Sequence, residues 1–481
     1  MSMKDFEMRL RDQRYAVFAA LLAVSLVLSF LITNNGLIVG LGAIAMLIGG
    51  IVLVFSFVNL QFGVLFLLSI SFFLQGVNRF SELPLGVIND TFVMVLTFGM
   101  IVQNVRKGNF KIPTDALSLI IFAWVAYNVL EVLNPAGNIE GWLHGVRGLI
   151  MLSPFFFVVR YVSTRKFVET LIHTWLFFAL LAALYGLYQE FVGLLPFEKQ
   201  WVMADPFRFK LLFNWGRFRI FSFFPDAALC GILMAYSSLL AFILAIETND
   251  VLRKIVYFTA GLLMAWVLIY TGTRTAFVIL PAAFGFYCIL TFKKGPIAAM
   301  TAGGLLLAFI IFTDVRSLGP LTTNSLNRIR SAFAPTDDRS YQTRMYNQAR
   351  IQPYIQSHPF GGGVGSSGLY GYRFNQASEL ASFSPDSGFV RAAVELGWVG
   401  LIIYCTMYFL VLRRGIIAYF NLRDPQLKGY CAALVSVAFC LILANFPQQS
   451  MTQVPTLLIF YAVMGMLSRI DELEQPIENK L

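Results

Sequence analysis

The sequence predicts an all-α polytopic membrane protein with about twelve to fourteen transmembrane helices and one large outer loop that contains short helices. Of its 481 residues, 58% are hydrophobic and only 13% are charged, and phenylalanine alone occurs 47 times. A soluble globular domain does not have this composition. Apolar runs of about 20 residues, enough to cross the hydrocarbon core of a bilayer, recur along the chain. One long polar segment, beginning at residue 314, interrupts them.

The apolar runs define the candidate spans in order. They fall at residues 15–33, 37–57, 60–76, 85–104, 115–133, 142–162, 168–192, 220–246, 253–271, 275–292, 296–313, 397–413, 429–446 and 455–469. The third run is short, so it is a candidate re-entrant segment. The first follows a basic amino terminus and lacks a small-residue cleavage site, so we expect a retained span with that terminus in the cytoplasm.

The spans divide the chain into three parts. Residues 1–313 hold the first eleven spans with short loops, residues 314–396 form the large outer loop, and residues 397–481 hold the last spans and a solvated cytoplasmic tail. Lysine and arginine in short loops favour the cytoplasmic side of a membrane. Such loops occur at residues 106–111, 160–166, 253–254, 293–294 and 413–414. Alternation then places residues 77–84, 134–140, 194–219, 271–274 and 314–396 on the outer face of the membrane.

The net charge of +10 follows mostly from cations that flank apolar runs, so we expect membrane lipids and no nucleic acid as partners. Two outer segments are nevertheless rich in cations. Residues 194–219 carry Lys199, Arg208, Lys210, Arg217 and Arg219, and residues 314–396 carry Arg316, Arg328, Arg330, Arg339, Arg344, Arg350, Arg373 and Arg391 but no lysine. Arginine grips phosphate with a planar fork of donors. We therefore expect an anionic partner on the outer face; the alternative is a solvated loop with a chance excess of arginine.

Three of these outer arginines lie at the ends of spans, where a charge is costly unless it is paired or used. Arg219 opens the sequence RIFSFFPD before the eighth span, Arg274 ends the turn TGTR, and Arg344 begins a helical-looking stretch. Gathered round one outer cavity, the three are candidates for binding a diphosphate. The alternative is that they extend to lipid headgroups.

Two further arginines are candidate substrate contacts, Arg339 and Arg391. On a regular helix Arg339 and Arg350 share a face, whereas Arg344 points about 140° away from Arg339. All three of the helical arginines therefore cannot grip one ligand, and some must be structural.

The densest glycine run, HPFGGGVGSSG, begins at His358. Glycine lets the backbone turn at positive φ or approach another surface closely, but the run lacks the lysine and following Ser/Thr of a phosphate-binding P-loop. We expect a tight turn with Gly363 and Gly365 as candidate substrate contacts. His358 is either a turn or capping residue or a base in contact with substrate.

Asp386 follows Pro385 and comes just before the apolar stretch that enters the twelfth span. A carboxylate there could cap a helix or act as the general base for an incoming hydroxyl, and the residues alone leave both roles open. The chain shows no paired metal-ligand spacing, no Ser-His-Asp order and no nucleotide-binding fingerprint, so no cofactor or metal is expected.

Four motifs in order resemble the O-antigen ligase and polysaccharide polymerase family, the Wzy/WaaL-like membrane glycosyltransferases. They are RIFSFFPD from Arg219, TGTR ending at Arg274, RMYNQARIQPYIQSHPFGGGVG from Arg344, and DSGFVRAAVELGWVGL from Asp386. The resemblance is best over residues 215–405, and the first half of the chain agrees only in being a series of spans. In ligases of this family the last motif opens with a His-Asn pair, and here Asp386 and Ser387 stand in those places.

The resemblance implies an undecaprenyl-diphosphate-linked oligosaccharide donor, a glycan acceptor, an active site on the outer face and a metal-free inverting transfer. The carboxylate in place of histidine favours a polymerase in exopolysaccharide or cell-envelope biosynthesis, with Arg219, Arg274 and Arg344 on the diphosphate and Asp386 as base. A ligase that passes glycan to a lipid or protein acceptor is the first alternative. A transporter is the second, although transporters carry ionisable residues near the membrane midplane, and here the charges lie at the outer ends.

Overall fold

The computed structural model describes residues 37–80, 86–108, 111–214, 216–313, 339–376 and 378–474, together with residues 25, 29, 32, 33, 330 and 333. The chain forms two compact units, Met1–Gly63 and Val64–Leu481, which are described separately. The first predicted span lies outside the described residues except at four helical positions, and Arg316 and Arg328 lie outside them altogether. The predicted domain boundaries at residues 313 and 396 stay a prediction.

The first unit contains helix α2 (Leu37–Val58), whose sequence is apolar throughout. Helix α3 (Leu60–Ser71) begins at its end and continues into the second unit. Met46 and Ile51 of α2 are 80% and 69% exposed. Apolar side chains that no other element covers are what a lipid-facing helix requires, which agrees with the second predicted span.

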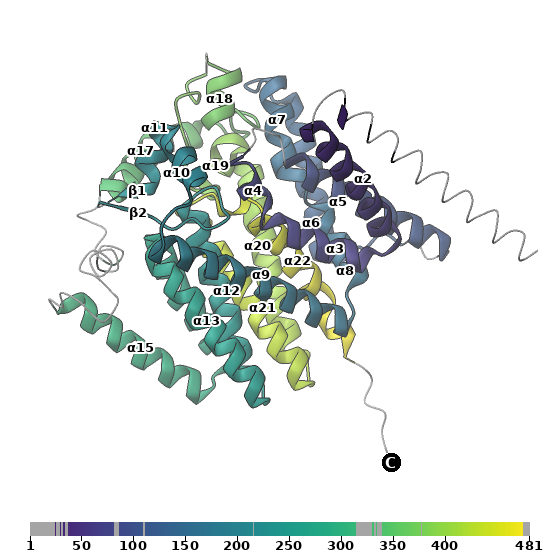
Figure 1. The fold of residues 1–481 in the computed structure, drawn as a ribbon. Coiled ribbons are helices and arrows are strands. Elements are labelled where there is room, and N and C mark those ends of the chain that lie inside the picture. The colour runs from purple at the N-terminus through teal and green to yellow at the C-terminus, as the bar shows by residue number, and fades with distance from the viewer. Residues whose placement is uncertain are drawn as a thin grey trace, which may run out of the picture. The chain divides into compact units, whose positions relative to one another are not determined.

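The second unit is a bundle of helices (Figure 1). Its long elements and their neighbours are α5 (Gly86–Arg106), α6 (Ala116–Leu130), η1 (Glu131–Leu133), α7 (Ile139–Ile150), α8 (Pro154–Val162), α9 (Arg165–Phe191), α12 (Ala227–Glu247), α13 (Val251–Thr271), α14 (Arg274–Thr291), α15 (Lys294–Phe312), α20 (Gly397–Asn421), α21 (Pro425–Ala444) and α22 (Thr456–Arg469). Nine helices of the described chain are long and apolar enough to cross a membrane, and further apolar helices are shorter. The all-α polytopic class is therefore confirmed; the total of twelve to fourteen spans stays a prediction.

Short elements gather at one end of the bundle, at the top of Figure 1. They are α4 (Leu74–Val77), α10 (Pro196–Met203), α11 (Pro206–Leu212), the hairpin of β1 (Phe213–Asn214) and β2 (Arg217–Phe218), α17 (Arg339–Ser357), α18 (Gly368–Phe374), α19 (Gly388–Glu395) and η3 (Ser450–Thr452). The two-residue strands pair antiparallel. A last short helix, η4 (Ile470–Leu473), follows α22. The short helices expected in the large outer loop are thus present as α17, α18 and α19.

Helices α12 and α21 form the centre of the second unit, because 89% and 78% of their apolar windows are buried. They pack against each other and against α14, and α12 also packs against α9 and α13. A small residue permits close approach where α12 meets the turn between α13 and α14: a Cβ at Gly231 would lie 2.6 Å from the Thr273 side chain. Close contact at small residues is a general device of membrane helix packing, and here it fixes the turn that carries Arg274.

The loops of the second unit form two groups, one at each end of the helix bundle, and the loops of each group contact one another. Ion pairs at one end join segments predicted to be cytoplasmic: Arg160–Asp115, Arg165–Asp424, Arg253–Glu169, Lys293–Glu247 and Arg414–Asp471. Hydrogen bonds at the other end join segments predicted to be outside: Arg79 to Glu198, Asn134 to Phe360, and Arg219 to Thr271. The two groups are those that alternation predicts. Which end faces the cytoplasm stays a prediction from the charge rule.

The eighth predicted span differs from the structure at its beginning. The sequence predicted residues 220–246, whereas α12 starts at Ala227, with Asp226 capping it by accepting a hydrogen bond from the Leu229 amide at 2.8 Å. Pro225 disfavours helical geometry at the residue before it. The apolar residues 220–224 therefore belong to an irregular segment that packs at the end of the bundle.

The segment that was predicted to be a solvated tail is tied to the bundle where it begins. Arg414 Nη1 donates to Asp471 Oδ2 at 2.8 Å, and Glu474 accepts a hydrogen bond from the Arg423 amide at 2.9 Å. Burial opposes the shift, but the Arg414 hydrogen bond holds the pKa of Asp471 below its usual value. Residues 475–481 lie outside the described residues.

Cysteine labelling will test the orientation. In a Cys405→Ser background, Leu369→Cys in α18 and Leu252→Cys in α13 offer sites at opposite ends, where the leucines are 76% and 71% exposed. The other four cysteines are buried. We expect a membrane-impermeant maleimide to label position 369 in intact cells and position 252 only after permeabilisation, because basic short loops stay inside. The reverse pattern would show that the assignment of sides is inverted.

Candidate active site

The turn between α13 and α14 is built by the sequence TGTR. Gly272 adopts φ 60° and ends α13 in the left-handed conformation, which glycine enters without a steric penalty. Thr273 Oγ1 donates to the Ala227 carbonyl at 2.8 Å and so ties the turn to the beginning of α12. Arg274 is the first residue of α14. Its side chain thus lies at a helix N-terminus, where unpaired amides and the helix dipole favour an anion.

Arg219 lies against this turn. Its Nε donates to the Thr271 carbonyl at 2.8 Å, and its Nη2 donates to Thr273 Oγ1 at 3.3 Å. The Arg219 amide donates to the Leu212 carbonyl at 2.8 Å, which continues the pairing that begins in the β1–β2 hairpin. The side chain is half-buried. The hairpin therefore positions Arg219 beside the turn that carries Arg274, although Arg219 and Arg274 are 55 positions apart in the chain.

Arg344 lies on α17. The helix ends just before His358, as the sequence predicted, but it begins at Arg339, earlier than the predicted beginning at Arg344. The Arg344 guanidinium is close enough to that of Arg274 for the two positive charges to repel each other. On its other side, Arg344 Nε lies 3.9 Å from Asp386 Oδ2, in an ion pair whose side chains are 32% and 49% exposed. The structure thus brings the four motifs to one region: Arg219 donates hydrogen bonds to the TGTR turn, Arg344 forms an ion pair with Asp386, and the charge of Arg344 acts on Arg274.

Asp386 does not cap the helix that follows it. Ser387 is the N-cap residue of α19, and its side-chain oxygen accepts the hydrogen bond from the Val390 amide at 3.4 Å. Ser387 is buried, whereas the Asp386 carboxylate faces solvent and Arg344. The capping role that the sequence left open for Asp386 thus belongs to its neighbour, and the carboxylate is available at the surface of the site.

The glycine run forms the expected tight turn, and its backbone is packed against protein. Gly361, Gly363 and Gly365 have φ values of 70°, 86° and 75°. A Cβ at Gly363 would lie 2.7 Å from the Gly137 Cα, and one at Gly365 would lie 2.3 Å from the Gly141 carbonyl oxygen. Both glycines are buried. Close packing against η1–α7 accounts for the run, and the role of Gly363 and Gly365 as substrate contacts stays a prediction.

Helices α17 and α19 are held together by an apolar cluster. Ile351 of α17 and Val394 of α19 pack with Leu380 and Phe383, which lie between them in the chain. The Gly362 amide adds a hydrogen bond to the Val394 carbonyl at 2.9 Å. Because the cluster fixes α17 against α19, it also fixes the distance between Arg344 and the segment that carries Asp386.

The other candidate residues lie apart from this cluster of charges. His358 lies beyond the end of α17, about 20 Å along the helix from Arg344 at 1.5 Å per residue; its Nδ1 lies 3.0 Å from the Tyr354 carbonyl oxygen, and its ring stacks on that tyrosine. It therefore occupies a turn position, as one of its two predicted roles requires. Arg339 opens α17, but its side chain lies outside the described part of the structure. Both stay predictions as substrate contacts.

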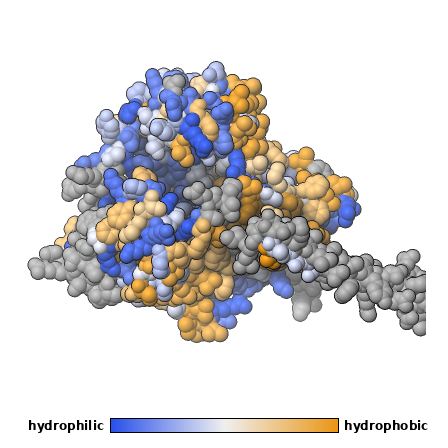
Figure 2. Space-filling model, turned by 45° about the horizontal axis from the view of Figure 1, so that its top comes forward, coloured by the Kyte–Doolittle hydropathy of each residue, from blue (hydrophilic) through white to orange (hydrophobic). Residues whose placement is uncertain are grey.

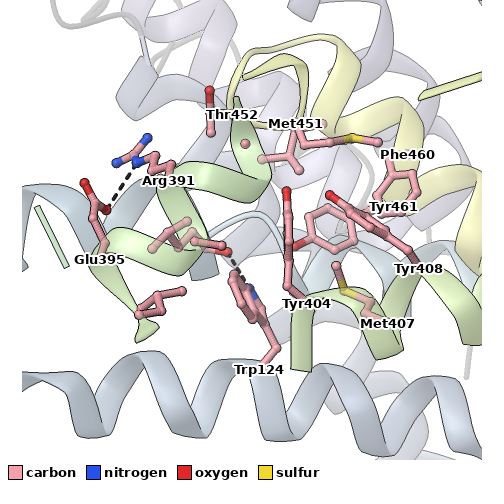
Figure 3. Close-up of a pocket in the computed structure, with 16 residues that line it drawn as sticks. Trp124, Arg391, Glu395, Tyr404, Met407, Tyr408, Met451, Thr452, Phe460 and Tyr461 are labelled. Atoms are coloured by element: carbon pink, nitrogen blue, oxygen red, sulfur yellow. Dashed lines mark hydrogen bonds and ion pairs between the residues drawn. The ribbon is translucent and has the colours of Figure 1, made fainter. Parts of the chain in front are cut away.

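Arg391 of α19 makes an ion pair within its own helix. Its Nε lies 3.1 Å from Glu395 Oε2, and Glu395 also accepts a hydrogen bond from Ser367 Oγ at 2.7 Å. Beneath this pair lies a cavity of about 40 Å³ that is lined by Trp124, Tyr404, Tyr408 and other mostly apolar residues. Figure 3 shows Arg391 and Glu395 on one side of this cavity and the tyrosines on the other. Arg391 as a substrate contact stays a prediction.

A buried ion pair that the sequence analysis did not find supports the Arg219 segment. Arg79 Nη1 lies 2.7 Å from Glu198 Oε1, with side chains only 2% and 0% exposed. Arg79 also donates to the carbonyl oxygens of Ser222 and Phe224 at 2.5 and 2.7 Å, and its guanidinium lies over the Phe221 ring. Burial lowers the pKa of Arg79 to about 10, and the charge of Glu198 opposes that shift, so Arg79 is charged at neutral pH.

Gln189 completes this network. Its Nε2 donates to Glu198 Oε1 at 2.8 Å, and its Oε1 accepts a hydrogen bond from the Ser222 amide at 2.8 Å. Residue Ser222 has a positive φ of 49°, which is uncommon outside glycine. Glu198 Oε2 also accepts a hydrogen bond from the Leu195 amide at 3.1 Å, but leucine has no side-chain acceptor, so the sequence shows no capping box there. The partner at Arg79 is 119 positions away, so the pairing itself had no local signature.

Polar side chains concentrate at this end of the second unit. Figure 2, which brings the top of Figure 1 forward, shows hydrophilic residues gathered there and hydrophobic residues on the flanks. Within the described residues no group of three or more His, Cys, Asp and Glu side chains is placed to hold a metal ion. The positive charge of the site comes from its arginines.

The fold and the site together define a polytopic membrane protein with a cationic site at one end of its helix bundle. A family model described as O-antigen ligase matches residues 259–405, from within α13 to the first part of α20. The match takes in Arg274, Arg344 and Asp386 and begins after the Arg219 motif. It confirms the resemblance to the O-antigen ligase and polysaccharide polymerase family that the motifs indicated. No curated protein matches the chain.

Substitution of the buried pair will test its role in stability. We expect Arg79→Ala to lower the free energy of unfolding by about 3–5 kcal/mol, because it leaves the Glu198 charge buried without a partner. Denaturant unfolding in detergent measures this change. Arg208→Ala is the control, since the guanidinium groups of Arg79 and Arg208 both lie over the Trp201 ring, but the Arg208 side chain is 29% exposed. We expect a loss of about 1 kcal/mol or less. Equal losses in the two variants would contradict a special role for the buried pair.

Proposed function

We propose that this protein is a membrane glycosyltransferase that polymerises glycan from an undecaprenyl-diphosphate-linked donor on the outer face of the bacterial inner membrane. One observation carries the proposal: Arg219 donates hydrogen bonds to the turn that carries Arg274, and Arg344 pairs with Asp386 at the same end of the bundle. Three guanidinium groups at one place suit a diphosphate, and a neighbouring carboxylate suits an acceptor hydroxyl. The family match supports the broader class of O-antigen ligase or polymerase.

The arginines would act on the leaving group. As the bond between the anomeric carbon and the diphosphate oxygen breaks, the electron pair and negative charge pass to the diphosphate. Arg219, Arg274 and Arg344 would stabilise this developing charge, and the N-terminus of α14 adds a favourable dipole. Repulsion between Arg274 and Arg344 favours binding of an anion between them. The arginines neutralise the diphosphate by themselves, so the proposed transfer is metal-independent.

Asp386 would act on the acceptor. The acceptor hydroxyl oxygen forms the new bond to the anomeric carbon from the face opposite the diphosphate, which inverts the configuration, and its proton passes to the Asp386 carboxylate. The ion pair of 3.9 Å between Asp386 and Arg344 supports a base close to the proposed diphosphate site. A hydroxyl held by Asp386 would lie within reach of the reacting carbon, as general-base catalysis requires.

Ligation of glycan to a lipid or protein acceptor is the second candidate function, since the matching family model is described as O-antigen ligase. Asp386 and Ser387 in place of the family's His-Asn pair favour polymerisation. Deletion of the gene separates the two. Accumulation of single repeat units on the lipid carrier would indicate a lost polymerase, whereas accumulation of long chains on the carrier would indicate a lost ligase. An unchanged lipid-linked pool would exclude both.

The diphosphate site predicts the effect of arginine substitutions. We expect Arg274→Ala and Arg219→Ala each to lower kcat by about 10²–10³-fold, the usual cost of losing one donor to a developing anion. Arg274→Lys should restore only part of the rate, because an ammonium cannot make the bidentate contact. The assay would use the lipid-linked glycan that accumulates in the deletion strain as donor. Arg350→Ala, at an exposed position of the same α17 that carries Arg344, is the control; full activity in folded Arg274 and Arg219 variants would remove both from the site.

The proposed base predicts a loss of turnover without loss of donor binding. Asp386→Asn keeps the shape of the side chain but removes its basicity, so we expect kcat to fall by about 10²–10⁴-fold with donor KM little changed. Asp386→His should retain more activity than Asp386→Asn, because imidazole can accept the same proton. Ser387→Ala is the matched control: it removes the helix cap, at a cost in stability of about 1 kcal/mol, and leaves the carboxylate. Near-normal turnover of Asp386→Asn would exclude the base role.

A further inference from the structure

The connection between α21 and α22 forms hydrogen bonds to the segment that carries Asp386. Asn445, fully buried at the end of α21, accepts a hydrogen bond from the Gly388 amide at its carbonyl oxygen, with a distance of 3.0 Å. The Asn445 side chain donates to the hydroxyls of Tyr404 and Tyr408 at 2.9 and 3.3 Å. Asn445 Oδ1 accepts a hydrogen bond from the Met451 amide at 3.4 Å. Asn445 is thus fixed from several sides and has little freedom to move with the segment that it holds.

Because Gly388 has no Cβ, its backbone can pack directly against the Asn445 side chain. A Cβ at Gly388 would lie 2.3 Å from Asn445 Oδ1, well inside van der Waals contact. The backbone φ at Gly388 is not in the left-handed region, so the glycine is required by the close approach and not by its conformation. The first turn of α19 therefore sits directly on the Asn445 side chain.

Gln449 makes a second contact on the other side of Asp386. Its Nε2 donates to the Pro385 carbonyl, and its Oε1 accepts a hydrogen bond from Arg391 Nη1 at 3.2 Å. Arg391 is itself fixed by the ion pair to the buried Glu395. Thr452 belongs to the same α21–α22 connection as Gln449. Figure 3 shows Thr452 and Arg391 on the same side of the cavity, away from Tyr404. One amide side chain thus links the backbone before Asp386 to the helix after it.

These contacts hold the backbone on both sides of Asp386 and leave its carboxylate exposed. Pro385 and Gly388 are bound by the α21–α22 connection, and Ser387 is buried as the cap of α19. The carboxylate between them meets Arg344. A rigid backbone under an accessible carboxylate is what a positioned general base requires, because a shift of about 1 Å can cost about 10²-fold in rate.

We propose that Gln449 is a positioning residue that acts through Asp386, with Asn445 as the fixed point beneath α19. This inference rests on the proposed role of Asp386 as the base. Gln449 and Asn445 lie outside residues 259–405, the segment that the family model matches, so the last connection of the chain completes a site whose other residues come before it. Loss of the Gln449 contact should let residues 385–387 move and should lower turnover more than donor affinity.

A double-mutant cycle tests the inference. We expect Gln449→Ala to lower kcat by about 10²-fold with donor KM little changed, whereas in an Asp386→Asn background the same substitution should lower kcat by about threefold or less. Strong non-additivity of this kind shows that two residues act as a unit. Gln449→Glu separates the two contacts, since its carboxylate can still accept from Arg391 but cannot donate to Pro385. We therefore expect Gln449→Glu to lower kcat about as much as Gln449→Ala does.

Two controls accompany the cycle, a neighbouring substitution and a test of folding. Gln448→Ala removes the neighbouring glutamine, which takes no part in the hydrogen bonds to Pro385 and Arg391, and should leave kcat unchanged. Thermal unfolding of each variant in detergent checks that it is folded. Additive losses from Gln449→Ala and Asp386→Asn, or normal turnover of Gln449→Glu, would overturn the positioning role while leaving Asp386 as the base. Normal turnover of Asp386→Asn would instead show that the proposed function itself is wrong at this residue.

Discussion

The ion pair between Arg79 and Glu198 is the interaction on which the end of the bundle depends. Two charges with almost no exposed surface are tolerated only because each has further partners: Arg79 donates to two carbonyl oxygens, and Glu198 accepts from Gln189 and from the Leu195 amide. Removing water from a charge is costly unless such partners replace it. The network thereby holds together the residues after α4, the beginning of α10 and the irregular segment before α12. Arg219 begins that last segment.

Close backbone contact at glycine is the second constraint. The turn after α17 meets η1–α7 through Gly363 and Gly365, and it meets the junction of α19 and α20 through Gly361, where a Cβ would lie 2.5 Å from the Gly397 amide nitrogen. A larger side chain at these positions would push the elements apart. The outer elements therefore form a packed cap on the end of the second unit, and α17 is one of its walls.

The site that results has more positive than negative charge facing its centre. The charge of Arg344 acts unfavourably on Arg274, and the Asp386 carboxylate, which is half exposed, lies 3.9 Å from Arg344. By contrast, Arg391 is paired with the buried Glu395 and linked to Gln449. The described arginines at this end of the second unit thus include two groups. Some hold the cap together, and others are placed where an anionic ligand would relieve their repulsion, which is why the latter carry the proposed function.

The sequence by itself determined the class of the protein and the chemistry of its motifs. Apolar runs of membrane-spanning length predict helices because the backbone of a lipid-exposed span must bond within itself, and the arginines stand out because so few charges occur elsewhere in the chain. The TGTR turn and the tight glycine turn follow from local rules of capping and positive φ.

Only the tertiary structure decided which residues meet. The pairing of Arg79 with Glu198 and the grip of Gln449 and Asn445 on the Asp386 segment join positions that are far apart in the chain, and no local pattern records such pairs. The cap of α19 falls on Ser387 and not on Asp386 because the fold buries one and exposes the other. Residue type and local spacing determine which chemistry a side chain can perform. Its partners and its exposure depend on burial and on contacts between distant parts of the chain, which only the whole fold determines.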